Sequence, residues 1–215
     1  MIIIYSIFYM IVCIPVFLFL GNGLHLLLGW NVFLAIVPLV LSNYFLSLVA
    51  QKRFRLGVMI FILWFISFPN TLYVITDLIH LGDRIFYYQE HIYAPVVYNH
   101  NIKDYLALMH IVIAVIISII SGIVSLHSIH QYFVERIGNI KAFAVLVIIS
   151  IASSIAIYIG RFLRFNTWDL FTSPQTLLKQ FVISLDLFSF YFIFLLTIVH
   201  LLLSFFIKSV FLYNY

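Results

Sequence analysis

The hydrophobic positions of this chain fall in long continuous runs, separated by short polar stretches. Each run is long enough to cross a hydrocarbon core of about 30 Å at about 1.5 Å per helical residue. Inside lipid the backbone must satisfy its own hydrogen bonds, and continuous runs without apolar-polar alternation favour helices over barrel strands. The pattern therefore predicts an all-α bundle of about six transmembrane helices in a single domain, over residues 2–20, 31–50, 56–81, 106–133, 142–162 and 181–208.

The composition supports a membrane location. The 215 residues are 65% hydrophobic and only 8% charged, whereas soluble domains are roughly 25% charged. We therefore expect a multi-pass protein of the cell membrane, surrounded by membrane lipids. The net charge of +4 does not indicate a nucleic-acid partner, because the Lys and Arg residues are scattered near segment ends. Cys13 is the only cysteine, which excludes an intramolecular disulfide.

Two basic clusters predict the orientation of the helices. Lys52, Arg53 and Arg55 follow the second apolar run, and Arg136 and Lys141 flank the loop after the fourth. Short cytoplasmic loops collect Lys and Arg, so both loops are expected inside. Counting crossings then places both termini in the cytoplasm.

Polar residues interrupt the third apolar run after Pro69. If the helix continues past this proline, the polar residues fall at helical spacing and form one stripe that must face protein or water. These residues are Asn70, Tyr73, Thr76, Asp77 and His80.

A second polar stretch lies at the outer end of the fifth run. It contains Arg161, Arg164, Asn166, Trp168 and Asp169. Arg161 and Arg164 are three residues apart and can share a helix face. Asp186 is expected about one turn inside the sixth helix, where a carboxylate needs a partner, and either arginine can supply it.

His110 is expected at a similar depth, so the topology predicts one outer-leaflet pocket. Its members are Asp77, His80, His110, Arg161, Arg164, Asp169 and Asp186.

Three functions fit this pocket. In an enzyme, Asp77 or another carboxylate orients a histidine base such as His80, and the arginines bind a phosphate or oxyanion. The remaining polar residues then contact the substrate. No Gly-x-Ser-x-Gly motif occurs, and the sequence identifies no cofactor. A metal site of His80, His110 and a carboxylate is disfavoured, because His-x-x-x-His and Glu-x-x-His spacings are absent.

The other two functions need no catalytic group. The charged residues can line a route for a small solute or ion, although their concentration at one face disfavours a continuous path. Alternatively they form a paired network that fixes helix ends and supports assembly with a membrane-protein partner. Of the three, we favour an enzyme that acts on a lipid or lipid-linked substrate at the extracytoplasmic face.

Other polar and small residues have simpler interpretations. Ser118 and Gly122 are four residues apart, a spacing that lets transmembrane helices approach closely. His127 and His130 lie three apart near the inner face, where interhelical hydrogen bonding is a better interpretation than metal binding.

Three stretches resemble a known family. They are Trp30 to Ala35, Phe68 to Leu81, and Gly160 to Asp169. Together they are similar to the bacterial membrane-protein family named for domain of unknown function 1361, over about residues 25–205. Thr71 and Thr167 are mild variants of that family's pattern. The resemblance implies a multi-pass bacterial inner-membrane protein and assigns no catalytic residue.

Overall fold

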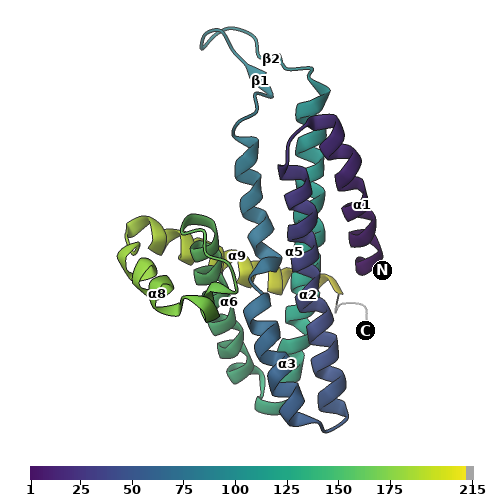
Figure 1. Cartoon of the computed structure of the whole chain (residues 1–215), viewed down its shortest axis with the longest axis vertical. Coiled ribbons are helices and arrows are strands. Elements are labelled where there is room, and N and C mark those ends of the chain that lie inside the picture. The colour runs from purple at the N-terminus through teal and green to yellow at the C-terminus, as the bar shows by residue number, and fades with distance from the viewer. Residues whose placement is uncertain (212–215) are drawn as a thin grey trace.

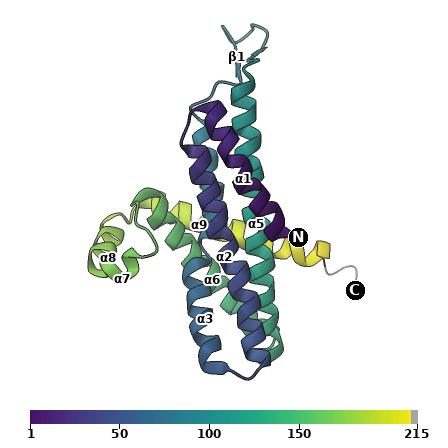
Figure 2. The same ribbon diagram turned by 45° about the vertical axis from the view of Figure 1, so that its right-hand side comes forward.

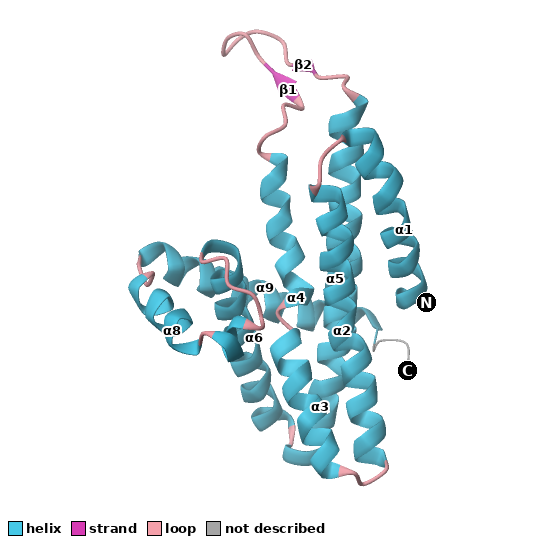
Figure 3. Ribbon diagram, viewed as in Figure 1, coloured by secondary structure: helices cyan, strands magenta, loops and turns pink. Residues whose placement is uncertain are grey.

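The computed structural model describes residues 1–211, with side chains described as far as Phe205. The long helices are α1 (Ile2–Leu20), α2 (Leu24–Ala50), α3 (Phe54–Ser67), α5 (Ile102–Ile137), α6 (Asn139–Phe162) and α9 (Leu187–Phe211). The short elements are α4 (Asn70–Tyr73), the 3₁₀ helix η1 (Val74–Leu81), β1 (Tyr87–Tyr88), β2 (Val97–Tyr98), α7 (Asp169–Thr172) and α8 (Pro174–Ile183). Figure 3 shows that helices dominate the described chain.

Six helical segments of the described chain are long and apolar enough to cross a membrane, with Phe54–Leu81 taken as one. This confirms the predicted all-α polytopic bundle. Helices α2, α5 and the α3–η1 column run along the long axis, and α1 packs against α2 and α5 (Figure 1). The β1–β2 hairpin lies at one end, and the α2–α3 and α5–α6 turns lie at the other. Helix α9 runs across this direction in both views (Figures 1 and 2).

The third span is not the continuous α-helix predicted over residues 56–81. Helix α3 ends at Ser67, and the short helix α4 begins at Asn70. The chain then continues as the narrower 3₁₀ helix η1. Pro69 is the physical reason for the break, because it has no backbone N–H and its ring crowds the preceding turn. An eight-residue 3₁₀ helix is unusually long and marks a segment held by its surroundings.

Two other helices begin earlier than the sequence predicts. Helix α2 starts at Leu24 rather than at residue 31, and the Asn22 side chain accepts a hydrogen bond from the Leu24 N–H at 3.0 Å. Helix α5 extends from Ile102 to Ile137 instead of 106–133, and Asn101 caps its first turn. At about 1.5 Å per residue, α5 is longer than a hydrocarbon core of about 30 Å. It must therefore tilt or extend into the interfacial region.

The predicted helix 181–208 is two elements, α8 and α9, which meet at a sharp capping motif. The Asp186 carboxylate accepts the Ser189 N–H at 2.8 Å, and the Ser189 hydroxyl oxygen accepts the Asp186 N–H at 2.8 Å. This reciprocal pair is a capping box, which satisfies two donors at the start of a helix. The cap explains why α9 starts at Leu187.

Close helix contacts hold the centre of the bundle together. A Cβ added at Gly122 of α5 would lie 2.6 Å from Thr71 of α4, so glycine is needed for this approach. The buried Trp64 indole donates to the Ser125 hydroxyl oxygen at 2.7 Å, and that hydroxyl donates to the Pro38 carbonyl at 2.9 Å. These bonds join α3, α5 and α2 inside the apolar core.

Candidate functional site

Asp77 is the centre of a polar cluster that joins η1, α2 and α6. The residue is only 3% exposed. One carboxylate oxygen, Oδ1, accepts a hydrogen bond from Nη2 of Arg161 and forms an ion pair with it. The other, Oδ2, accepts a hydrogen bond from the Asn31 amide at 2.8 Å. Both oxygens are therefore engaged within the chain, as a buried carboxylate requires.

The Arg161 guanidinium is held on three sides. Its Nε donates to the Thr76 hydroxyl oxygen at 2.6 Å, and its central carbon lies 4.7 Å from the centre of the Tyr73 ring. The Thr76 hydroxyl in turn donates to the Tyr73 carbonyl at 2.6 Å. A Cβ at Gly160 would lie 3.3 Å from the Tyr73 ring, so the absence of a side chain there makes room for the ring. The guanidinium is thus fixed by hydrogen bonds and a cation–π contact.

Four predicted site residues therefore meet, and sequence reasoning missed a fifth. Tyr73, Thr76, Asp77 and Arg161 form this cluster with Asn31. The available signal was an asparagine at the start of the predicted second span, because a polar side chain in a span needs a partner.

Asn70 does not join the cluster. Its side-chain amide donates to the Ser67 carbonyl at 3.0 Å, at the point where α3 ends. Its observed contact therefore stabilises the break at Pro69.

His80 lies beside a separate cavity at the hairpin end of the bundle. The cavity has a volume of about 520 Å³ and is lined by Asn22, Leu24, Leu27, His80, Asp83, Arg84 and Asp104. Arg84 donates to Asp104 at 2.6 Å, and Asn99 donates to the other carboxylate oxygen at 3.1 Å. His80 is half-buried and makes no hydrogen bond to another described side chain. The cavity combines titratable groups with two leucines.

Asp77 and His80 do not form the predicted carboxylate–histidine pair. No hydrogen bond joins them within the described residues, and both Asp77 oxygens already have donors. A 3₁₀ helix has three residues per turn, so His80 follows Asp77 by one turn. The structure therefore connects the two residues through the backbone of η1.

His110 is buried in a different cluster, between α1, α2 and α5. The Tyr9 hydroxyl donates to the His110 carbonyl at 3.1 Å, and its oxygen lies 3.1 Å from His110 Nδ1. The Nδ1 atoms of His25 and His110 are also 3.1 Å apart. One of these two nitrogens must carry the shared proton, so the two rings adopt opposite tautomers in their neutral forms. Tyr9 and His25 were not predicted as functional residues.

The second polar stretch is not part of a single pocket. Helix α6 ends at Phe162, and Arg164 has a left-handed backbone with φ of 58°, so it leaves the face that carries Arg161. Arg164 and Trp168 are exposed, and the Asn166 N–H donates to the Asp169 carboxylate at 2.6 Å. These local contacts shape the turn into α7.

The predicted pairing of Asp186 with an arginine is wrong. Arg161 pairs with Asp77, and the Asp186 carboxylate caps α9. At the start of a helix, backbone N–H groups donate hydrogen bonds to a capping carboxylate. The carboxylate is therefore stabilised without a cation beside it.

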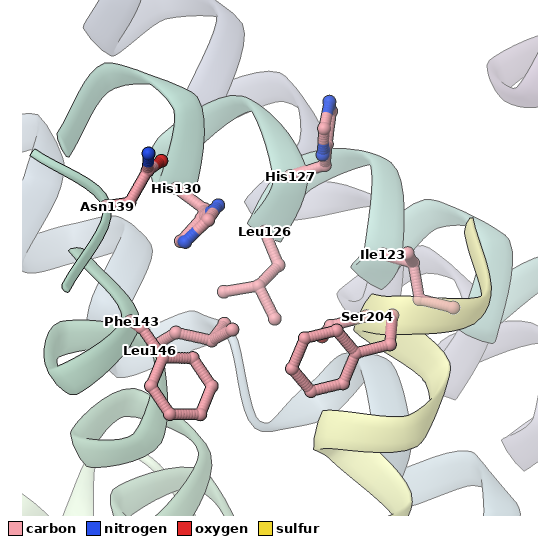
Figure 4. A pocket seen from close by; sticks show the side chains of 9 residues that line it. Ile123, Leu126, His127, His130, Asn139, Phe143, Leu146 and Ser204 are labelled. Carbon is pink, nitrogen blue, oxygen red and sulfur yellow. The ribbon is translucent and has the colours of Figure 1, made fainter. Parts of the chain in front are cut away.

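A smaller cavity, of about 240 Å³, lies near the α5–α6 turn (Figure 4). His127 and His130 reach it from α5, Asn139 and Phe143 from α6, and Ser204 from α9. Deeper between α6 and α9, the Ser153 hydroxyl lies 3.0 Å from His200 Nε2. These groups lie away from the Asp77 cluster and connect α9 to the rest of the bundle.

Comparison with known proteins identifies the family of this chain and leaves its activity open. Neither the curated proteins nor the solved structures that were compared give a match. A family model described as "Protein of unknown function (DUF1361)" matches residues 30–203 and so includes Asn31, the α3–η1 break and the Arg161 region. The chain is therefore a multi-pass membrane protein that belongs to the DUF1361 family.

Proposed function

We propose that the chain is a membrane-embedded enzyme that acts on the polar head of a lipid or lipid-linked substrate, bound in the cavity beside His80. The observation that supports this proposal most directly is the lining of the cavity. His80, Asp83 and Arg84 face the same space as Leu24 and Leu27. Such a lining suits a molecule with a polar head and an apolar tail. The cavity also lies where α2, η1 and α5 begin or end.

His80 is the proposed proton-transferring group. A histidine side chain can both accept and donate a proton, and this one has no hydrogen-bond partner among the described side chains to occupy its ring. Arg84 is the proposed anion-binding group. Its Nη1 atom donates to Asp104 and lies 3.4 Å from the Lys103 carbonyl, which holds the side chain in place. The rest of its planar donor group can bind a phosphate oxygen.

Asp77 and Arg161 are proposed to position this site. Their ion pair fixes η1 against α6, and His80 follows Asp77 by one 3₁₀ turn. Residues that hold a reacting group in one geometry contribute to catalysis even when they do not touch the substrate. This assignment replaces a direct acid–base role for Asp77, because its carboxylate is 3% exposed and fully engaged.

We place this end of the bundle on the extracytoplasmic side. The basic loop at residues 51–55 and the α5–α6 turn lie together at the opposite end (Figure 1). Short loops rich in Lys and Arg are typical of the cytoplasmic side.

The enzyme proposal is tested with purified protein in lipid nanodiscs. We incubate three proteins, the wild type, His80→Gln and Arg84→Gln, with a total lipid extract of the membrane in which the protein naturally resides. The products are compared by mass spectrometry. We expect a lipid species converted by the wild type and unchanged by His80→Gln, while thermal unfolding stays the same. Equal product profiles for wild type and His80→Gln would overturn the proposal.

One observation favours a second function, that of a structural subunit in a membrane complex. The Asp77 cluster is satisfied inside the chain, and saturated polar networks rigidify a bundle. This alternative predicts that Asp77→Asn and Arg161→Gln lower the folded fraction, while His80→Gln changes neither stability nor any lipid product. Both functions predict the loss of stability in Asp77→Asn and Arg161→Gln, so the lipid products of His80→Gln separate them.

A further inference from the structure

The segment between α6 and α9 contains the short helix α8, which follows the end of α6. Helix α6 ends at Phe162 and α9 begins at Leu187, and both are long and apolar enough to cross a membrane. Because α9 runs across the direction of the long helices (Figures 1 and 2), segment 163–186 follows a single span, α6, and begins where that span reaches a membrane surface. In Figures 1 and 2 its helices, α7 and α8, form a lobe at the side of the bundle.

One stripe of α8 faces the rest of the chain, and the end of the helix contacts α6 through Phe181 and Ser184. Leu177 is buried and Phe181 is half-buried, and the Phe181 ring lies 6.4 Å from the Tyr158 ring, centre to centre. The Tyr158 hydroxyl donates to the Ser184 carbonyl at 3.0 Å, just after α8 ends. These contacts fix which way the other faces of α8 point.

The exposed surface of α8 divides into an apolar row and a polar face. Pro174, Leu178 and Val182 are four residues apart and exposed, so they form one row beside the packed stripe. Leu178 is 60% and Val182 is 64% exposed. The opposite face consists of Gln175, Thr176, Lys179 and Gln180, all exposed. Ile183, in the last turn, is the one residue that departs from this division.

We propose that α8 lies in the plane of the membrane surface, with the Pro174–Leu178–Val182 row in the lipid and the polar face toward water. A helix with separate apolar and polar faces, placed soon after the end of the α6 span, matches the chemistry of the headgroup boundary. Trp168, directly before α7, is exposed, and tryptophan is enriched at this depth. Lys179 lies on the water-facing side, where it can meet lipid phosphates.

Single cysteines test this placement directly. Cys13 is the only native cysteine and is buried, so Cys13→Ala gives the background. Thr176→Cys and Val182→Cys are a matched pair, because both positions are exposed on the same helix. Each protein is labelled with an environment-sensitive fluorophore in phosphatidylcholine nanodiscs. Quenching is then measured with aqueous iodide and with a lipid that carries a nitroxide on its acyl chain.

The two positions should respond in opposite ways. At position 182 we expect the lipid-borne quencher to act severalfold more strongly than iodide, and at position 176 the reverse. Strong iodide quenching at both positions would overturn the proposal, because α8 would then be surrounded by water. Weak iodide quenching at both positions would also overturn it, because position 176 would then not face water. Efficient disulfide cross-linking of unlabelled Val182→Cys between two chains would also overturn it, because a second copy would then cover the apolar row. Thermal unfolding of each labelled protein checks that the fold is intact.

Discussion

Removal of the Asp77 charge should destabilise the protein more than any other single isosteric change among its acidic residues. Asp77→Asn keeps the size of the side chain but leaves the Arg161 guanidinium, whose side chain is 16% exposed, without its counter-ion. Removing one partner of a buried ion pair costs about 3 to 5 kcal/mol. Because Arg161 retains some contact with solvent, we expect the lower end, about 3 kcal/mol.

This loss should be visible as a lower unfolding temperature. For a chain of this length, 1 kcal/mol corresponds to about 2 to 4 °C, so the shift should be roughly 6 to 12 °C. The assay is thermal unfolding in nanodiscs, followed by tryptophan fluorescence. Asp83→Asn is the matched control, because Asp83 is exposed and its replacement should change stability by less than about 0.5 kcal/mol.

A double-variant cycle then tests the pairing itself. Asp77→Asn combined with Arg161→Gln removes both charges, so the double variant should lose less stability than the two single losses added together. Strict additivity, or an Asp77→Asn protein that unfolds at the wild-type temperature, would refute the ion pair as a stabilising contact.

Three further changes test the packing and the buried polar groups. Gly122→Ala should lower stability by about 1 to 3 kcal/mol, because its Cβ would overlap Thr71, whereas Gly23→Ala, with nothing within 4 Å of the added atom, should have little effect on the unfolding temperature. Trp64→Phe should cost about 1 to 3 kcal/mol, through the lost hydrogen bond to Ser125 and the lost volume, and a comparable loss for the exposed Trp30→Phe would contradict this explanation. Tyr9→Phe should cost about 1 kcal/mol by removing the hydroxyl between α1 and His110, and an unchanged unfolding temperature would count against that contact.

The membrane spans follow from the sequence because they depend on local composition. An apolar run such as residues 142–162 is readable without knowing its neighbours, and α6 occupies Asn139–Phe162. The break at Pro69 was visible as a proline, but the switch to a 3₁₀ helix was not. Thr76 and Asp77, which lie in this 3₁₀ helix, contact Arg161 of another helix, and the hydropathy pattern does not show such contacts.

The pairing of charged residues was predictable only in part. The sequence indicated that Asp77 and Arg161 lie near one membrane face, yet it favoured Asp186 as the partner of the arginine. Depth along a helix follows from counting residues, whereas the direction in which a side chain points depends on helix rotation and packing. Asp186 illustrates the difference, because its capping box with Ser189 required knowledge of where α9 begins.

The directions in which the histidine side chains point were also not predictable from the sequence. His110 was predicted beside His80, but α5 turns it toward Tyr9 and His25 in the interior of the bundle. The cavity beside His80 is instead completed by Arg84 and Asp104, which the sequence analysis left outside the site. Both lie in or next to the long hairpin loop, whose course the hydropathy pattern does not determine.

The most direct test of the proposed substrate site is native mass spectrometry of the protein released from its own membrane in polymer nanodiscs. The proposed function predicts that wild-type protein retains a specific lipid or lipid-linked molecule in a one-to-one complex, and that His80→Gln and Arg84→Gln proteins of equal stability lose it or retain it unreacted. An identical set of bound molecules and products in the wild type and both variants would contradict a substrate site at this cavity.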